Sequence, residues 1–292
     1  MIFAHGIAIG RLVGLEHTAA SAVSPCTKIA TVAHAGLVES FLRYYRPMDF
    51  ASHDPSKGAL PFAAGSVART VEEAILSRRS LRAFRPDPVP RETVERILAL
   101  ASRAPSGSNI QQWQVIVVAG EVRARLCRAM HAAFMQHGEE GWKREYDYYP
   151  PQWREPYLAR RRKLGWDLYG LLGIGKGERE KTQRQLGRNF LFFDAPVGLV
   201  ITLDRDLPVG AWLDTGMFVQ TLMLAARAFG LDTCAQAAIA NAHSVLRREL
   251  AIPGEQIVVC GMSLGYARAD AAENELVTER EPVSRFARFL GF

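Results

Sequence analysis

The run Arg78-Arg79-Ser80-Leu81-Arg82 gathers residue types that bind anions. Its three guanidinium groups repel one another unless something anionic lies between them. Arginine binds phosphate through planar bidentate contacts, and the hydroxyl of Ser80 adds a further donor. The run therefore favours an anion-binding site. A solvated basic helix end, where the helix dipole favours arginine, is the alternative.

A second stretch, Ala104-Pro-Ser-Gly-Ser-Asn-Ile-Gln-Gln-Trp113, is rich in small polar residues. The backbone N–H groups and hydroxyls of such a stretch can lie against a flat heterocycle. Taken alone, its proline, glycine and serine content is equally typical of an ordinary loop between a helix and a strand.

Other catalytic or metal-binding motifs are weak. The four cysteines, Cys26, Cys127, Cys234 and Cys260, are far apart and form no C-x-x-C pair. This spacing predicts neither a metal site nor a disulfide framework and is typical of a reducing cytoplasm. Residues 170–177 match the spacing of a phosphate-binding P-loop, but glycine stands at the last position, where serine or threonine would bind magnesium.

The composition is close to that of an average globular protein, with a basic balance that suits nucleic acid and anionic small molecules equally. The 292 residues are 48% hydrophobic and 23% charged, and the net charge is +6. Arginines gather around 78–85 and 160–163 rather than along one stripe, so we expect no nucleic-acid binding. No run of about 18 consecutive apolar residues is present, and residues 1–10 lack the basic start of a signal peptide. We therefore expect a cytoplasmic protein that makes no membrane contact.

Helices and strands of an α+β protein surround the two stretches. Thr70 can cap a helix that leads into the arginine run, and a second helix starts at Arg91. Apolar runs at 113–119, 195–203 and 256–264 predict buried strands. Helices are expected from about Glu121, at 214–229, where the pattern favours burial on most sides, and at 245–250. A small amphipathic helix is expected to end the tail 280–292.

The expected domain organisation is a poorly structured extension at 1–65 followed by one domain at 66–292. An insertion at about 138–185 is aromatic, basic and punctuated by glycines. Its aromatic residues could pack on a partner subunit. Alternatively, they could form a wall over a cofactor, with 160–163 (Arg-Arg-Arg-Lys) meeting a carboxylate or a nucleotide phosphate.

Taken together, these segments resemble the FMN-dependent nitroreductase family. The order R-R-S-x-R-x-F, a helix, A-P-S-G-S-N-x-Q-x-W and a buried strand is similar to the N-terminal half of that family. Residues 230–236 (GLDTCAQ) resemble its G-L-G-T-C-P-Q turn, and 261–266 (GMSLGY), Asn274 and 278–280 (TER) resemble its closing elements. The resemblance covers residues 70–290 in the right order, which is more specific than any single motif.

The resemblance implies a nitroreductase-like α/β sandwich, with a central, mostly antiparallel sheet flanked by helices, in an intertwined homodimer with flavin sites at the interface. The residues implied for the FMN phosphate and ribityl chain are Arg78, Arg79, Ser80, Arg82 and Arg280. Those implied to reach the flavin from the other subunit are Pro105, Ser106 and Asn109. Backbone N–H groups near flavin N5 would come from Gln236, Ala237 and Ala238.

The activity implied is transfer of a hydride from NAD(P)H through flavin N5 to an electron-poor aromatic, above all a nitroarene, by a ping-pong mechanism. No side chain need act as an essential acid or base. Gln112 and Ala235 depart from the family, which commonly has proline at both places. The alternatives are a flavin-dependent reductive dehalogenase or ene-reductase on the same fold, and a flavin-binding protein without turnover.

Overall fold

The computed structural model describes residues 65–138 and 141–292. Apart from Gly65, the predicted extension at 1–65 therefore lies outside the described residues.

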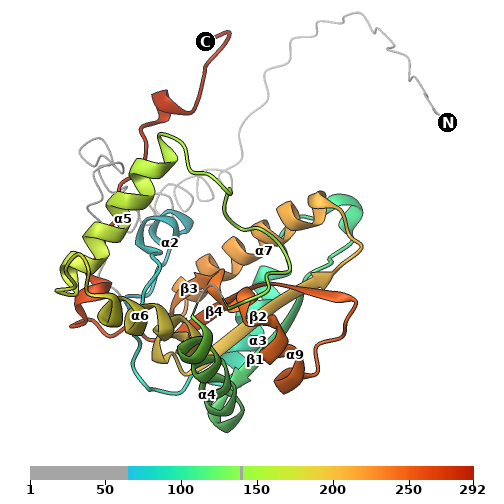
Figure 1. The fold of residues 1–292 in the computed structure, drawn as a ribbon. Coiled ribbons are helices and arrows are strands. Elements are labelled where there is room, and N and C mark those ends of the chain that lie inside the picture. Colours follow the sequence, from blue (N-terminus) through green and yellow to red (C-terminus); the bar gives the residue numbers. More distant parts are fainter. Residues whose placement is uncertain (1–64, 139–140) are drawn as a thin grey trace, which may run out of the picture. The chain divides into compact units, whose positions relative to one another are not determined.

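A four-stranded sheet forms the centre of the described chain (Figure 1). Its order is β1-β2-β4-β3, and each pair of neighbours is antiparallel. This confirms the predicted antiparallel sheet. The strands are β1 (Gln114–Ala119), β2 (Val197–Asp204), β3 (Asp232–Gln236) and β4 (Gln256–Gly265).

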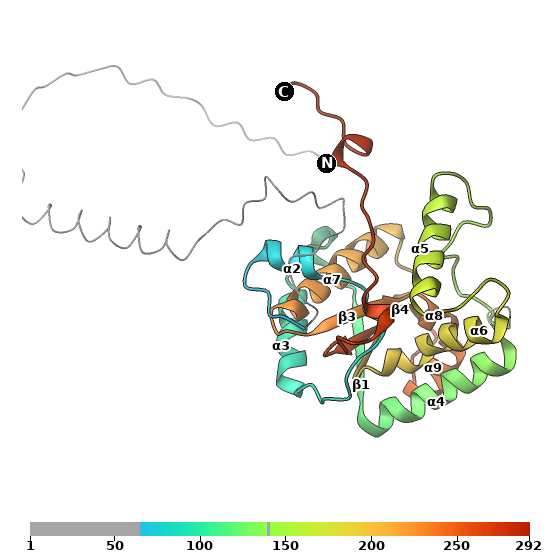
Figure 2. The ribbon, with the colours of Figure 1, turned by 90° about the vertical axis from the view of Figure 1, so that its left-hand side faces the viewer.

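Helices cover both faces of the sheet and bury two hydrophobic cores (Figure 2). One core joins α3 and α7 to β2 and β4, and the other joins α4, α8 and α9 to the opposite face. Three layers follow, as expected for an α+β sandwich. The helices are α2 (Val71–Ser77), α3 (Arg91–Ala101), α4 (Gly120–His137), α5 (Tyr157–Leu171), α6 (Arg179–Gly187), α7 (Val209–Arg227), α8 (Ala238–Asn241) and α9 (His243–Leu250).

The predicted start of α2 is confirmed. The Thr70 hydroxyl accepts a hydrogen bond from the Glu73 N–H at 3.1 Å, and the Glu73 carboxylate accepts one from the Thr70 N–H at 3.2 Å. This reciprocal capping box fixes where the helix begins. The arginine run therefore starts directly after a short, well-defined helix.

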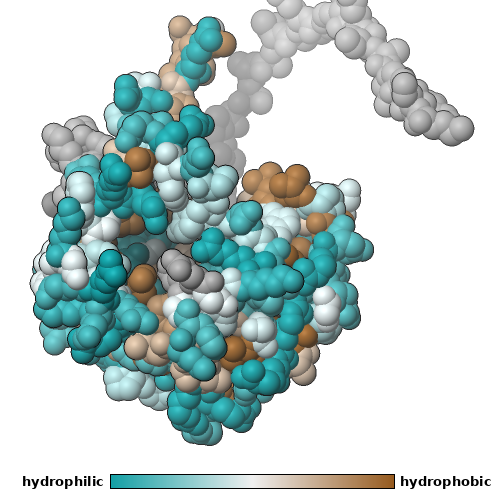
Figure 3. All heavy atoms as spheres, in the orientation of Figure 1, coloured by the Kyte–Doolittle hydropathy of each residue, from teal (hydrophilic) through white to brown (hydrophobic). Residues whose placement is uncertain are grey.

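The single chain buries α7 on one side rather than on most sides. Thr215, Phe218 and Leu222 face the core, whereas Val209 and Leu213 are 83% and 70% exposed. Figure 3 shows an apolar patch over this amino-terminal end of the helix. Among the described helices, α7 is also the one whose length and composition would allow it to cross a membrane. Its buried side packs on α3, β2 and β4.

Three details of the predicted secondary structure are wrong. The run at 113–119 forms the edge strand β1, and it is not buried throughout: Val117 is 40% exposed and lines a cavity beside α3. Strand β3 was predicted as a turn. The tail leaves the core before it forms one 3₁₀ turn, Val283–Arg285, so no core surface supports an amphipathic helix there (Figures 1 and 2).

A left-handed turn precedes β2. Phe192, Phe193 and Asp194 all have positive φ, which non-glycine residues adopt at a cost of about 1–2 kcal/mol each. The Ser263 hydroxyl oxygen lies 2.8 Å from the Phe192 carbonyl oxygen and so contacts this turn. The Phe192 ring lies against Gly198, where an added Cβ would be 2.7 Å from it, so only glycine fits at that point of β2.

Candidate functional site

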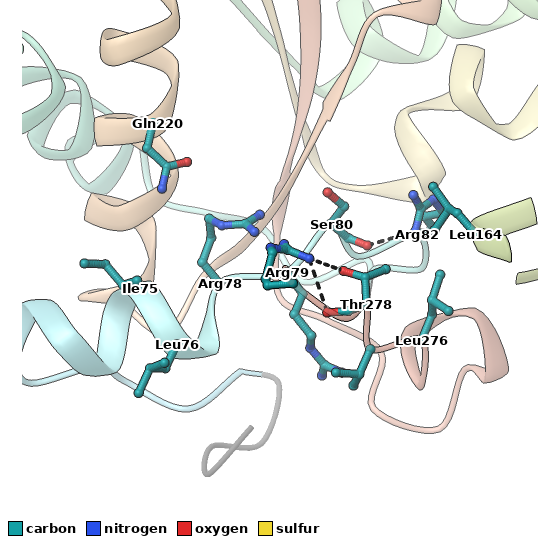
Figure 4. A pocket seen from close by; sticks show the side chains of 12 residues that line it. Ile75, Leu76, Arg78, Arg79, Ser80, Arg82, Leu164, Gln220, Leu276 and Thr278 are labelled. Carbon is teal, nitrogen blue, oxygen red and sulfur yellow. Dashed lines mark hydrogen bonds between the residues drawn. The ribbon is translucent and has the colours of Figure 1, made fainter. Parts of the chain in front are cut away.

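Five residues predicted from the sequence line one cavity of about 460 Å³ (Figure 4). Arg78, Arg79, Ser80 and Arg82 come from the chain after α2, and Arg280 comes from the C-terminal segment. None of the described residues that line the cavity is acidic. The remaining lining residues are Ile75 and Leu76 of α2, Leu164 of α5, Gln220 of α7, and Leu276, Val277 and Thr278.

The arginine run lies beside β3 as a short extra strand. Ser80 forms a parallel bridge with Thr233, and the Leu81 N–H donates to the Thr233 carbonyl at 3.2 Å. Further along, Phe84 forms an antiparallel bridge with Ala267, just after β4. The run is therefore held between two chain segments that belong to the central sheet, which fixes the direction in which its side chains leave the backbone.

The buried side chain of Asn274 completes this arrangement. Its carbonyl oxygen accepts a hydrogen bond from the Arg82 N–H at 2.7 Å, and its amide donates to the carbonyls of Ala83 at 2.8 Å and Arg268 at 2.9 Å. Asn274 is thus a positioning residue for the arginine run. It is part of the sequence resemblance, but the residues alone assigned it no role.

A buried ion pair lies behind the run. The Arg227 guanidinium contacts the Asp232 carboxylate at 2.7 Å, and the two side chains are 1% and 2% exposed. Arg227 also donates to the hydroxyl of Ser77 at 3.0 Å, at the end of α2, and to the carbonyl of Leu231 at 3.3 Å. This pair therefore ties α7, β3 and the end of α2 together directly before Arg78.

The electrostatics of the cavity favour an anion. Burial lowers the pKa of Arg78, and repulsion by Arg280 lowers it further. Burial also lowers the pKa of Arg79, opposed by the nearby Asp232 carboxylate. Both shifts mean that positive charge is held in a partly desolvated place without enough negative charge nearby. A bound phosphate would relieve this repulsion through charge-assisted hydrogen bonds.

The second predicted group does not line this cavity in the single chain. Pro105, Ser106 and Asn109 lie in the loop around the 3₁₀ turn Gly107–Asn109. The Gly107 N–H donates to the Asp214 carboxylate of α7 at 2.9 Å, so the loop is fixed on the outer side of α7. Ser108, Asn109 and Gln111 have positive φ, so the loop keeps a strained shape. Its contact with a cofactor across a dimer interface stays a prediction.

The third predicted group lies where β3 ends and α8 begins. The side chain of Gln236 is buried and satisfied: it donates to the Asn189 carbonyl at 2.8 Å and accepts from the Ser263 hydroxyl at 2.6 Å. Ala237 and Ala238 follow at the first turn of α8. Gln236 therefore supports the fold with its side chain, and a cofactor contact from this segment would use backbone N–H groups, as the resemblance implies.

A model of the nitroreductase family matches residues 75–266. The chain belongs to the nitroreductase family. A 4-nitrobenzoate reductase of Nocardioides sp. (strain LMS-CY) is 39% identical over 243 residues, which are 82% of this chain and 98% of that protein. A chloronitrobenzene nitroreductase of Comamonas testosteroni is 40% identical over 220 residues, which are 75% of this chain and 96% of that protein.

Solved nitroreductase structures confirm the fold. The FMN- and NADPH-dependent nitroreductase NfnB from Sphigopyxis sp. strain HMH is 36% identical and has a TM-score of 0.73; the match covers 76% of this chain and all of that one. The FMN-dependent NfnB from Mycobacterium smegmatis, solved in complex with NADPH, is 35% identical with a TM-score of 0.71, over 75% of this chain and 97% of that one.

The segment predicted as an insertion, about 138–185, borders the arginine-lined cavity of this nitroreductase through Leu164 of α5. In its basic run, Arg160 pairs with Glu281 at 2.7 Å, and the Arg161 guanidinium lies 4.9 Å from the ring centre of Trp153. This contact between α5 and the C-terminal segment was missed from the sequence, because no local pattern connects residues so far apart.

Proposed function

We propose that this nitroreductase binds FMN in the arginine-lined cavity and reduces nitroaromatic compounds with electrons from NAD(P)H. The observation that carries the proposal is the cavity itself, where four guanidinium groups and a serine hydroxyl converge without an acidic residue among the described lining. Such a set of donors matches a phosphate monoester, which carries a charge of about −1.5 to −2 at pH 7.

The residues present fit FMN in three respects. Arg78, Arg79 and Arg82 offer several N–H donors in fixed planar forks. Arg280 approaches from a separate segment, so that an anion between them would be held from two sides. Apolar side chains such as Leu276 line other parts of the cavity, beside which the carbon chain of a ribityl group can lie.

A bound flavin supplies two-electron chemistry, accepting a hydride from a nicotinamide and passing the electrons to a nitro group. The chain's own residues bind and orient: the arginines fix the phosphate end, and the end of β3 offers backbone N–H groups to the ring. Positive charge around the cofactor also stabilises the reduced, more negative state. This arrangement needs no side chain as an essential acid or base.

The names of the relatives support a substrate class and an electron donor. The relatives are named for nitrobenzoate and chloronitrobenzene, so we infer that single-ring nitroarenes are reduced. NADPH is the donor in the M. smegmatis NfnB structure, which supports it here. The exposed apolar side of α7 and the loop fixed on it would form the interface of a cytoplasmic homodimer, with Pro105, Ser106 and Asn109 reaching the partner's flavin.

Flavin binding and electron transfer test the proposal together. The purified protein should be yellow, bleach with NADPH under anaerobic conditions and recover its colour when 4-nitrobenzoate is added. Bleaching without reoxidation by any nitroarene, but with reoxidation by a haloaromatic or an activated alkene, would support the dehalogenase or ene-reductase alternative. Absence of any colour change with NADPH or NADH would favour a binding protein without turnover.

Arginine variants test the site. Arg78→Ala and Arg82→Ala should each weaken FMN binding by about 1.5–3 kcal/mol, the contribution of a hydrogen bond to a charged group. The matched control is Arg85→Ala, three residues beyond Arg82, whose side chain is exposed and pairs with Asp87 outside the cavity. Titration of the apoprotein with FMN, followed by flavin fluorescence, measures all three. Equal affinities for Arg78→Ala, Arg82→Ala and wild type would contradict the assignment.

A further inference from the structure

The segment that carries Arg280 lacks regular secondary structure. Residues 278–282 lie between the 3₁₀ turns Ala272–Asn274 and Val283–Arg285 and form no strand or helix of their own. Within this segment the side chains separate into two sets. Arg280 lines both the arginine cavity and a neighbouring cavity beside α5, whereas Glu279 and Glu281 line the neighbouring cavity alone.

Two basic residues of α5 bind the two glutamates. The Arg160 guanidinium donates from Nε at 3.2 Å and from a terminal nitrogen at 2.7 Å to one oxygen of Glu281. The Lys163 ammonium donates to the Asp167 carboxylate of the same helix at 2.7 Å and lies 3.8 Å from the Glu279 carboxylate. Arg160 and Lys163 are one helical turn apart, so that one side of α5 meets both glutamates. We call these four side chains the α5 clasp.

The guanidinium of Arg280 is fixed to the same segment. It donates to the Thr278 carbonyl at 3.2 Å, the Thr278 hydroxyl at 2.7 Å and the Glu279 carbonyl at 2.9 Å. The place of this guanidinium therefore depends on the place of the backbone at 278–279. Anything that holds that backbone also holds Arg280 at the edge of the cavity.

Arg280 needs such support because its neighbours repel it. Arg78, Arg79 and Arg82 line the same cavity, which has no acidic residue among its described lining. Like charges at short range push apart most strongly when no anion is bound. A segment without secondary structure would give way by moving Arg280 outward, unless contacts on its other side oppose the movement.

We propose that Arg160 and Lys163 are positioning residues for FMN: the α5 clasp holds Glu279 and Glu281, and thereby keeps Arg280 in place for the cofactor's phosphate. This inference rests on the proposed function of the cavity. On this proposal the predicted insertion supports cofactor binding without touching the cofactor. It also assigns Arg160 and Lys163 a use other than recognition of a nucleotide phosphate, since carboxylates within the chain already partner both.

The clasp can be tested by whether FMN affinity falls or rises when the two glutamates lose their charge. Replacing Glu279 and Glu281 with glutamine removes two negative charges beside an anion site. If these residues act only through the electrostatic field, the variant Glu279→Gln/Glu281→Gln binds FMN more tightly than wild type. If they act through the clasp, the same variant binds FMN more weakly, by about three- to tenfold, as expected for the loss of two partly exposed ion pairs.

A second comparison completes a double-mutant cycle between the two glutamates and the two basic residues of α5. The variant Arg160→Gln/Lys163→Gln should also bind FMN about three- to tenfold more weakly than wild type. The variant with all four substitutions should bind FMN no more weakly than either double variant. If the four residues act only through the electrostatic field, the variant with all four substitutions should instead bind FMN as tightly as wild type does. The matched control, Asp270→Asn/Glu275→Gln, removes the same charge from the preceding stretch, and neither Asp270 nor Glu275 is paired with α5 in the described structure.

The readout is the Kd of the apoprotein for FMN, measured by flavin fluorescence, with riboflavin as a ligand that lacks the phosphate. The clasp variants should weaken FMN binding and leave riboflavin binding unchanged. Arg78→Ala and Arg280→Ala test the assignment of the cavity separately from the α5 clasp. If both bind FMN as wild type does, the cavity assignment is wrong and the clasp falls with it. If both weaken FMN binding while the glutamate variant binds equally or more tightly, the clasp alone is overturned.

Discussion

Replacing Arg227 with methionine should be among the most damaging single changes in this protein. The guanidinium is 1% exposed, and its loss would leave the Asp232 carboxylate, itself 2% exposed, without its ion-pair partner. Hydrogen bonds to the Ser77 hydroxyl and the Leu231 carbonyl would be lost as well. Removing one partner of a buried ion pair destabilises a protein by about 3–5 kcal/mol, because the remaining charge stays desolvated.

Denaturation with urea measures this prediction, at one protein concentration because the stability of the proposed homodimer would depend on it. The double variant Arg227→Met/Asp232→Leu removes both charges and should recover part of the lost stability, since apolar residues can fill the space. Arg227→Met should also weaken FMN binding, because Ser77 directly precedes the arginine run. A loss below about 1 kcal/mol, or a double variant no more stable than Arg227→Met, would refute the reasoning.

The pH dependence gives an independent check on the same variant. Burial raises the pKa of Asp232 even in the wild-type protein, opposed by Arg227. Without Arg227 this pKa rises further above the value in the unfolded chain, which is about 3.9. When the folded-state pKa of an acid is raised, the folded protein becomes less stable as the pH rises from the unfolded-state pKa to the folded-state pKa. The destabilisation of Arg227→Met should therefore be smaller at pH 5 than at pH 8.

Three further predictions concern separate contacts. Gly198→Ala places a Cβ 2.7 Å from the Phe192 ring and should lower the free energy of unfolding by about 1–3 kcal/mol, measured by urea denaturation. Asn274→Ala removes three hydrogen bonds from the arginine run and its neighbours and should weaken FMN binding in the fluorescence titration, by about tenfold or more. Burial alone would raise the pKa of Glu145, but hydrogen bonds from Arg205 and Arg247 outweigh it and lower the pKa. Glu145→Gln should therefore lose stability at neutral pH, and the difference from wild type should vanish as the pH falls below that lowered pKa.

The sequence predicts best those elements whose reasons are local. Thr70 and Glu73 cap α2 through groups three residues apart, and both lie next to the arginine run. Strands β2 and β4 are long apolar runs that stay buried in any context. Five of the twelve residues that line the arginine cavity were predicted, because their chemistry and order resemble one family. Their convergence from two distant segments came from that resemblance and not from periodicity.

What the sequence misses depends on distant partners. Strand β3 has a mixed composition, and pairing with β4 makes it a strand. The sequence pattern of an apolar run such as β1 is the same whether the strand lies at the edge or in the middle of a sheet. The pair Arg160 and Glu281 is separated by 121 positions, so a basic run on α5 looks like a solvated or ligand-binding face until the fold brings its partner near.

The arginine run is tied to the chain by hydrogen bonds that join residues far apart in sequence. The bond from Asn274 to the Ala83 carbonyl spans 191 positions, and that from Arg227 to Ser77 spans 150. Contacts between such distant positions close large loops and form late in folding. A partly folded or nascent chain therefore lacks the arrangement that we propose binds phosphate, and on that proposal only molecules whose sheet is complete can capture flavin. At a hundredfold excess of free FMN over its Kd, capture adds about 2.7 kcal/mol of stability to those finished molecules alone. If FMN binds as proposed, a larger supply of cofactor would lower the unfolded fraction of newly made copies and so slow their proteolysis.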